Sequence, residues 1–238
     1  MDTVGLLWRH EAQEPPRRGR PPKLTTDQVV AAAIAVADRA GLSFTLRDIA
    51  AALDAPVMSL YSYVDSREQL LELMVDQCRL DMAHTDQDGG WTERLTAVAA
   101  DNARLFDGHP WLADIESERA ILGPGTLAKY ERELGAVQSL PLSDVARDAA
   151  LTLVVDFVRS SARAKAHARR EREQEAPEQW WEREGARLAE LGVAERFPLA
   201  SRIGTAAGQA QNAATDADAA HEFGLKIILA GLASPEKR

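Results

Sequence analysis

Cysteine is almost absent from the sequence, which has Cys78 as its single example. One thiol cannot form an intramolecular disulfide, so nothing in the sequence points to an oxidising compartment. Long apolar runs are missing too: VGLLW, residues 4–8, is too short for the core of a signal peptide, and no later run reaches the roughly 18 residues of a membrane helix. We therefore expect a cytoplasmic protein that does not enter a membrane.

Aromatic residues make up only 5% of the chain, and runs of β-branched residues are rare. Alanine, leucine, glutamate and arginine dominate instead, which favours helices over strands. We expect an all-α fold. With 238 residues and 45% apolar content, the chain is long enough for one large domain or two smaller ones, each with its own core.

The residue patterns of common catalytic and metal sites are also missing. The histidines are dispersed, with no pair four residues apart: His10, His84, His109, His167 and His221. There is no glycine-rich phosphate loop, no serine elbow and no cysteine–histidine arrangement. We expect neither an enzyme nor a bound metal or cofactor, and we interpret Cys78, in an apolar stretch, as a packing residue.

Positive charge is scarce overall, because the net charge is −9. This argues against a protein that covers nucleic acid with its whole surface. RRGRPPK, residues 17–23, nevertheless gathers basic side chains before a helix start. This stretch fits either a disordered tail or an arm that contacts DNA. We favour the arm because RGRP is the core of the AT-hook pattern. In that pattern, Arg18 and Arg20 would lie in a narrow A·T minor groove. Lys23 is the third predicted contact of this flexible basic arm, residues 1–24.

Three helix starts follow the arm at capping-box spacing: Thr25 with Gln28, Thr45 with Asp48, and Ser66 with Gln69. Each opens an apolar-periodic stretch, which predicts helices over 27–40, 46–53, 57–63 and 67–83, the first of them closed by Gly41. Two short helices joined by a tight turn and packed on an earlier helix make a helix-turn-helix.

QDGG, residues 87–90, predicts a boundary between a DNA-binding domain over 25–86 and a second domain over 87–238. In the second domain we expect helices over 91–107, 110–118, 124–138, 143–172, 177–191 and 218–232, with a further one near 198–203. The small, polar, glycine-containing stretch 204–219 predicts a flexible loop.

The stretches FTLRDIAAAL, SLYSYV and SREQLLELM, within residues 24–76, resemble the amino-terminal domain of the tetracycline-repressor family. HPWL and HEFGLKIILAGL are similar to that family's carboxy-terminal domain. The resemblance implies a homodimer with a four-helix bundle built from 143–172 and 218–232, and a repressor that a small, mostly apolar inducer releases from a palindromic double-stranded operator. The alternative is a helical protein-interaction module with a degenerate helix-turn-helix.

The resemblance also implies DNA contacts at the start of the second helix, in the third and at the start of the fourth: Thr45, Arg47, Val57, Met58, Ser59, Tyr61, Ser62, Tyr63 and Arg67. The amino terminus of a helix suits Arg67 for a phosphate contact. The third helix has neither Lys nor Arg, so methyl contacts and single hydrogen bonds replace the bidentate guanine contact. Asp54 and Ala55 stand where the family usually has Gly and Val.

Residues of the inducer site are less marked in the sequence. Asp156 stands out, because a carboxylate within the apolar stretch LTLVVDFV is costly unless it is paired or exposed. The predicted lining is Asn102, Phe106, Trp111, Asp156, Phe157, Arg163 and His167. The histidines that serve tetracycline and magnesium in the tetracycline repressor are not reproduced, so neither ligand is implied. Trp180 and Trp181 fit a pocket lid or a packing anchor equally well.

Overall fold

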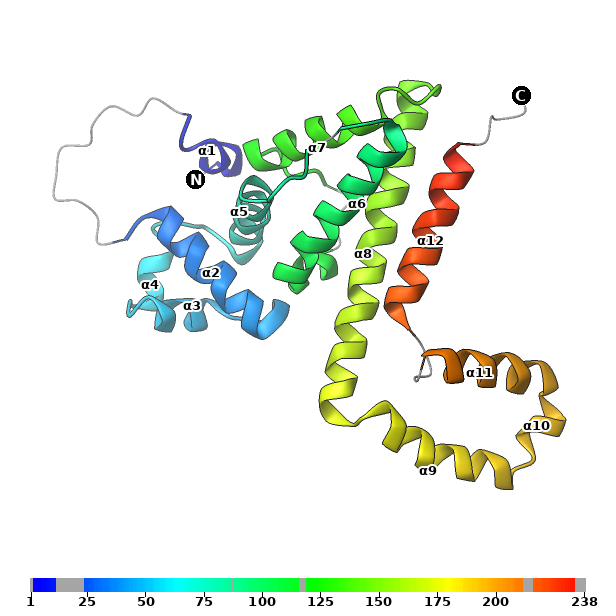
Figure 1. The fold of residues 1–238 in the computed structure, drawn as a ribbon. Helices are drawn as coiled ribbons and strands as arrows, with labels where there is room; N and C mark the ends of the chain where they lie inside the picture. The colour runs from blue at the N-terminus through cyan, green and yellow to red at the C-terminus, as the bar shows by residue number, and fades with distance from the viewer. Residues whose placement is uncertain (1, 12–23, 87, 116–118, 212–215, 234–238) are drawn as a thin grey trace, which may run out of the picture. The chain divides into compact units, whose positions relative to one another are not determined.

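The computed structural model describes residues 2–11, 24–86, 88–115, 119–211 and 216–233, and all regular structure in those ranges is helical. This confirms the all-α prediction (Figure 1). The chain forms two compact units, residues 1–159 and 160–238. These units are defined by packing within the chain. The domain boundary after residue 86, which was predicted from the QDGG stretch, stays a prediction. No helix in the described ranges is long and apolar enough to cross a membrane.

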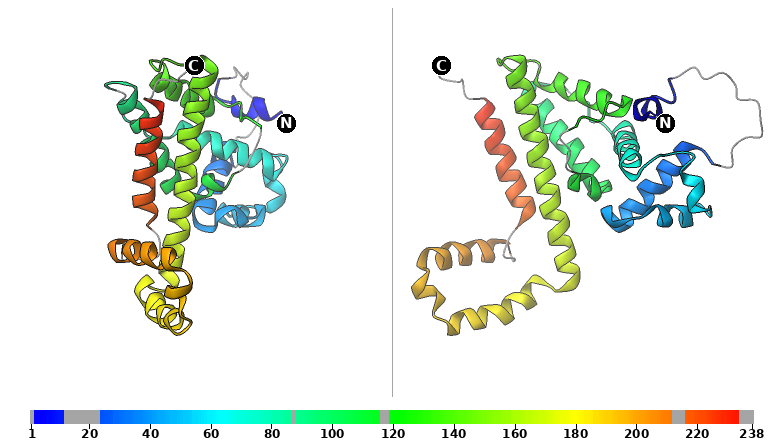
Figure 2. Two further views of the ribbon diagram at one scale, coloured as in Figure 1. Left: turned by 90° about the vertical axis from the view of Figure 1, so that its right-hand side faces the viewer. Right: turned by 180° about the vertical axis from the view of Figure 1, so that it is seen from behind.

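The four predicted amino-terminal helices are present as α2 (Thr26–Ala40), α3 (Leu46–Ala52), α4 (Val57–Leu60) and α5 (Arg67–Leu80), and α2 to α4 lie together in Figure 2. Reciprocal capping boxes at Thr25 and Thr45 start α2 and α3, as predicted. The Ser66 side chain accepts from the Gln69 amide at the start of α5. Gly41 ends α2 with a φ of 62°, the backbone conformation for which glycine was expected there.

Apolar side chains of these helices form one core. Its largest fully buried members include Val29, Val30, Ile49, Leu60, Val64, Leu70, Leu73 and Met74. Leu60, the last residue of α4, and Val64, four residues later, are fully buried, and α4 packs on α3. The opposite face of α4 is thereby left at the surface.

A short helix not expected from the sequence, α1 (Thr3–Leu7), precedes α2 and packs on α5. It buries Leu6 and Leu7. The Trp8 indole N–H donates to the Leu122 carbonyl at 2.8 Å, and Arg9 Nε donates to Asp27 at 2.7 Å. The Asp2 side chain caps the helix locally, since it accepts from the Gly5 amide at 3.2 Å. Because five residues show no helical period, we attribute the position of the helix to the long-range contacts.

The rest of the first unit consists of α6 (Trp91–Gly108), a short 3-10 helix η2 (Pro110–Asp114), α7 (Pro124–Val137) and the first half of α8 (Asp144–Gln174). Residues 110–118 were predicted as one helix, but the 3-10 helix found there ends at Asp114, and residues 116–118 lie outside the described residues. α7 packs on both α5 and α6. A helix of the second predicted domain, α7, therefore packs directly against α5, the helix that follows the helix-turn-helix.

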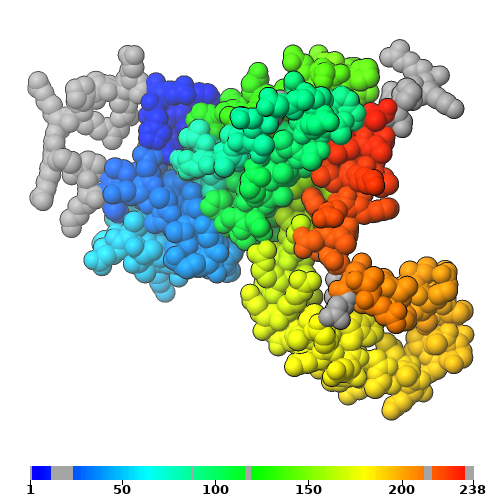
Figure 3. Space-filling view, viewed as in Figure 1, coloured from blue at the N-terminus to red at the C-terminus, as the bar shows by residue number. Residues whose placement is uncertain are grey.

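The second unit contains the end of α8, then α9 (Pro177–Glu190), α10 (Val193–Arg196), α11 (Pro198–Gln211) and α12 (Ala217–Leu232). The predicted loop over 204–219 is wrong for residues 204–211 and 217–219, which are helical, while residues 212–215 lie outside the described residues. In residues 204–211, alanines outweigh Gly204 and Gly208. None of the described residues of α9 to α12 is buried, and in Figure 3 their side chains lie at the surface of this unit.

Candidate DNA-reading helices and cavity

The turn between α3 and α4 has a left-handed residue, Asp54, with a φ of 48°. Asp54 is the non-glycine residue with positive φ among the described residues, and it stands where the resembling family usually has glycine. Aspartate tolerates this conformation better than most side chains do. The turn geometry therefore survives the departure from the family pattern.

The predicted base-reading residues lie on the outer face of α4 and the turn that follows it. Met58 is 76% exposed and Tyr61 is 47% exposed, while Leu60 between them is fully buried. Ser62 is exposed, and Val57, Ser59 and Tyr63 are half-buried. The Ser59 hydroxyl donates to the Pro56 carbonyl at 2.6 Å, which fixes the first turn of α4. Met58 and Tyr61 are thus the most prominent side chains of this face.

The predicted contacts beside α4 have structural partners of their own. The Thr45 hydroxyl donates to Asp48 at 2.7 Å, whereas Arg47 is exposed. Arg67 donates to the Leu42 carbonyl at 2.6 Å, and its guanidinium lies 4.8 Å from the centre of the Phe44 ring. One Arg67 nitrogen is thereby used to hold the α2–α3 connection. The arm residues Arg18, Arg20 and Lys23 lie outside the described residues.

A cavity of about 840 Å³ lies within the first unit, and side chains of α5, α6, η2, α7 and α8 line it. Asn102, Phe106 and Asp156, three of the predicted ligand-binding residues, are among these side chains. Val75 and Arg79 of α5 line it as well. The helix that follows the helix-turn-helix therefore forms part of the cavity wall.

The cavity has a buried polar side. The Asn102 amide donates to Glu133 Oε1 at 2.5 Å, and Lys129 Nζ donates to Glu133 Oε2 at 2.7 Å. Burial lowers the pKa of Lys129, while the Glu133 charge acts in the opposite direction. Arg79 donates to the Thr126 hydroxyl at 3.1 Å, and burial lowers its pKa too.

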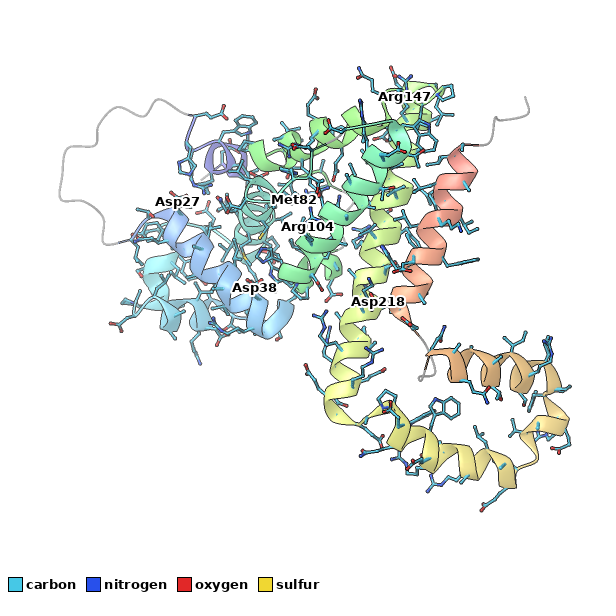
Figure 4. The ribbon with its side chains drawn as sticks, in the orientation of Figure 1. Asp27, Asp38, Met82, Arg104, Arg147 and Asp218 are labelled. Carbon is cyan, nitrogen blue, oxygen red and sulfur yellow. The ribbon has the colours of Figure 1, made fainter. Side chains whose placement is uncertain are left out.

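The remaining predicted ligand-binding residues, Trp111, Phe157, Arg163 and His167, are not among the side chains that line this cavity. Trp111 is only 1% exposed, and its indole N–H donates to Asp38 of α2 at 2.8 Å. His109 Nδ1 lies 2.8 Å from the same carboxylate oxygen. Figure 4 labels Asp27 and Asp38 at the two ends of α2. Trp111 thus joins α2 to η2, and a role for it at a ligand stays a prediction.

Sequence reasoning did not identify Arg79, Lys129 or Glu133. Lys129 and Glu133 are four residues apart in a helix, a spacing typical of an exposed ion pair. Their burial follows from the packing of α7, for which the sequence holds one signal: Gly123 and Gly125 at its start. A Cβ atom on Gly125 would lie 2.1 Å from the Asp76 carbonyl oxygen. That approach brings α7 against α5.

Cys78 is buried, and its pKa is raised to about 12, chiefly by burial and further by the charges of Asp38 and Asp81. A thiol with that pKa is not reactive at neutral pH, which agrees with a packing role. No group of three or more potential metal ligands occurs among the described residues.

A family model for the tetracycline repressor-like carboxy-terminal domain matches residues 83–235. The chain belongs to the tetracycline repressor family. An HTH-type transcriptional repressor of Streptomyces coeruleorubidus, DrrR1, is 31% identical over 84% of this chain and 76% of its own length. The family and this relative are transcriptional regulators rather than enzymes, so this chain is a DNA-binding transcriptional regulator.

Solved structures of transcriptional regulators also match, one of them described as a tetracycline repressor family protein. ActR from Streptomyces coelicolor in complex with actinorhodin has a TM-score of 0.69 and 27% identity, over 89% of this chain and 97% of that chain. A regulator from Streptomyces coelicolor A3(2), described as a putative transcriptional regulator, has a TM-score of 0.64 and 28% identity, over 90% of this chain and all of that one.

Proposed function

We propose that this regulator is a homodimeric repressor that a small molecule, bound in the cavity, releases from a palindromic operator. The observation that carries the proposal is that Val75 and Arg79, on the helix that continues from the helix-turn-helix, line the cavity. The volume of about 840 Å³ is within the range of sites for drug-sized ligands. The similar protein ActR was crystallised with a small molecule, actinorhodin.

The ligand can change DNA affinity because α5 connects the cavity to the exposed face of α4. A ligand changes DNA affinity only by the ratio of its own affinities for the two states of the protein. Because α5 contributes to the cavity wall, a ligand that favours one position of α5 also favours one position of α4. The predicted DNA contacts on α4 and around it are the residues through which that shift would act.

Dimerisation is supported by the apolar side chains that a single chain leaves exposed on α8 and α12, which include Val145, Leu153, Phe223 and Ile227. One recognition helix reads few base pairs, and a two-fold dimer doubles the contacts on a palindrome. A regulator of this kind acts on the chromosome, which is why the cytoplasm remains the predicted location.

A gel shift with DNA that flanks the coding region tests the function. We expect a shifted band at moderate salt, and its loss on addition of a compound that also raises the melting temperature. Light scattering is expected to give about twice 26.0 kDa. If no flanking fragment shifts and the protein is monomeric, the helical interaction module becomes the better description.

A further inference from the structure

The cavity wall contains a buried hydrogen-bond acceptor without a donor. Asn102 Oδ1 has no hydrogen-bond partner, and the residue is 0% exposed. Leaving such an atom unpaired costs roughly 1 to 3 kcal/mol, so buried acceptors of this kind are uncommon. Asn102 is among the residues that line the cavity, and a donor bound there reaches Oδ1 once the side chains that cover this atom move aside.

The orientation of the Asn102 amide follows from its neighbours. Its nitrogen lies 2.9 Å from the Val98 carbonyl oxygen and 2.5 Å from Glu133 Oε1, and both of these atoms are acceptors. A flipped amide would set its oxygen against a carbonyl and a carboxylate, which is repulsive. The nitrogen therefore faces the protein, and the oxygen is the atom left for a ligand.

The guanidinium of Arg79 is a second group on the cavity wall without a carboxylate bonded to it, although the charges of Asp76 and Glu133 partly offset the lowering of its pKa by burial. Its hydrogen bond goes to the uncharged Thr126 hydroxyl, and no carboxylate of the described residues lies within ion-pair distance of it. The nearby Asp76 carboxylate accepts instead from the amides of Gly125 and Thr126, at 3.2 and 2.7 Å. A largely buried cation of this kind is stabilised by a bound anion.

The carboxylates that line the cavity are already engaged. Glu133 accepts from Lys129 and Asn102, Asp148 accepts from the Tyr130 hydroxyl at 2.7 Å, and Asp156 accepts from Arg159 at 2.6 Å. Their negative charge is therefore matched locally by these partners. Arg79 is consequently a favourable place for a negative group on a ligand.

We propose that the effector is a largely apolar organic acid with a separate hydrogen-bond donor: its acidic group pairs with Arg79, and its hydroxyl or N–H donates to Asn102 Oδ1. The apolar part contacts Phe106, Leu105, Leu112 and Leu151, which line the same cavity. This inference rests on the proposed function, because it takes the cavity as the effector site.

Two fluorescent dyes with one skeleton test the acidic group. 8-Anilino-1-naphthalenesulfonate carries an anion and an N–H, and N-phenyl-1-naphthylamine keeps the N–H but lacks the anion. We expect Arg79→Gln to weaken binding of the sulfonate by about tenfold or more, the usual size of a charge-assisted contact, and to leave the neutral dye within about twofold. Arg79→Lys is expected to restore much of the difference. Arg202→Gln, which removes an exposed charge on α11 outside the cavity lining, is the control and is expected to change neither affinity.

The donor is tested with Asn102→Leu, which is of similar size. We expect this variant to bind N-phenyl-1-naphthylamine several-fold more weakly than the unmodified protein does. The N-methylated dye, which has no donor, is expected to bind both proteins alike. Circular dichroism melts establish that each variant is folded.

A measurement on the unmodified protein covers the case in which the Arg79 variants do not fold. 6-Hydroxy-2-naphthoic acid is expected to displace the sulfonate dye at about tenfold lower concentration than its methyl ester does. Equal competition by acid and ester, or equal dye binding by unmodified and Arg79→Gln protein, overturns the proposal. Dye binding needs no DNA, so a failed gel shift would reject the repressor function without affecting these results.

Discussion

At the scale of single residues, Asp54 occupies a conformation that glycine adopts without steric cost. Its φ of 48° strains any side chain with a Cβ atom. We expect Asp54→Gly to raise the free energy of unfolding by up to about 1 kcal/mol, as measured by urea denaturation.

Asp54→Ala is the matched control for that change. It removes the same charge but keeps a Cβ atom, so it is expected to be neutral or destabilising. If Asp54→Gly and Asp54→Ala stabilise the protein equally, the gain comes from removal of the carboxylate and not from relief of backbone strain.

At the scale of elements, α1 depends on an ionised Asp27. Burial tends to raise the pKa of Asp27, but hydrogen bonds and charge from Arg9 and His10 prevail and lower it below 3.8. A lowered carboxyl pKa means that the stabilisation is complete above the ordinary value and is lost as pH falls through the lowered one. We expect the amide hydrogen-exchange protection of residues 3–8 to decrease once the pH is lower than about 4. The measurement is made at pH values where circular dichroism shows that the rest of the protein is still folded.

The same experiment at neutral pH separates this ion pair from general acid effects. Asp27→Asn is expected to show the reduced protection of α1 already at pH 7. Asp144→Asn, which removes the exposed partner of Arg147, should leave α1 unchanged. Unchanged protection in Asp27→Asn would mean that Leu6, Leu7 and Trp8 alone hold the helix.

The contact between α5 and α7 is the second element whose role can be measured. The Asp76 carboxylate accepts from two amides at the start of α7, and a Cβ atom on Gly125 would lie 2.7 Å from the Leu80 amide nitrogen and closer still to the Asp76 carbonyl. Backbone atoms cannot move aside as side chains do. We expect Gly125→Ala to destabilise the protein by about 3 kcal/mol.

Gly204→Ala in α11 is the control for that substitution, because a Cβ atom there meets nothing within 4 Å. It is expected to stabilise slightly, since alanine is the better helix former. Comparable melting temperatures for the Gly125 and Gly204 variants would show that α7 does not need its close approach to α5.

At the scale of the whole molecule, we predict that DNA recognition is divided between the arm and α4. Replacing Arg18 and Arg20 with alanine is expected to weaken operator binding and to reduce its salt dependence by up to about one unit of slope for each lost contact. Met58→Ala removes an exposed side chain without charge, so the salt slope should stay the same while discrimination between bases relaxes by roughly 1 to 3 kcal/mol. An unchanged slope in the double arginine variant would leave recognition to the helix-turn-helix alone.

The sequence predicted those parts of the molecule that depend on local chemistry. The caps at Thr25 and Thr45 and the turn at Gly41 need only neighbouring residues, so their spacing revealed them. The helix α1 and the buried pair Lys129–Glu133 depend on segments far away in the chain, and in isolation they look like a tail and an exposed ion pair. Residues 204–211 were misjudged for another reason, since two glycines concealed a stretch whose alanines favour a helix.

The close approach of α7 to Asp76 also has a consequence for how this sequence can diverge. The start of α7 fits closely against Asp76, because a Cβ atom on Gly123 or Gly125 would lie within 2.2 Å of an atom of Asp76. A substitution at any one of these three positions therefore requires a compensating change at the others. A relative with a larger residue at position 125 must hold α7 farther from α5, and its cavity then has a different shape. The residues at these three positions should accordingly sort relatives by whether they accept the same effector, before any ligand of theirs is known.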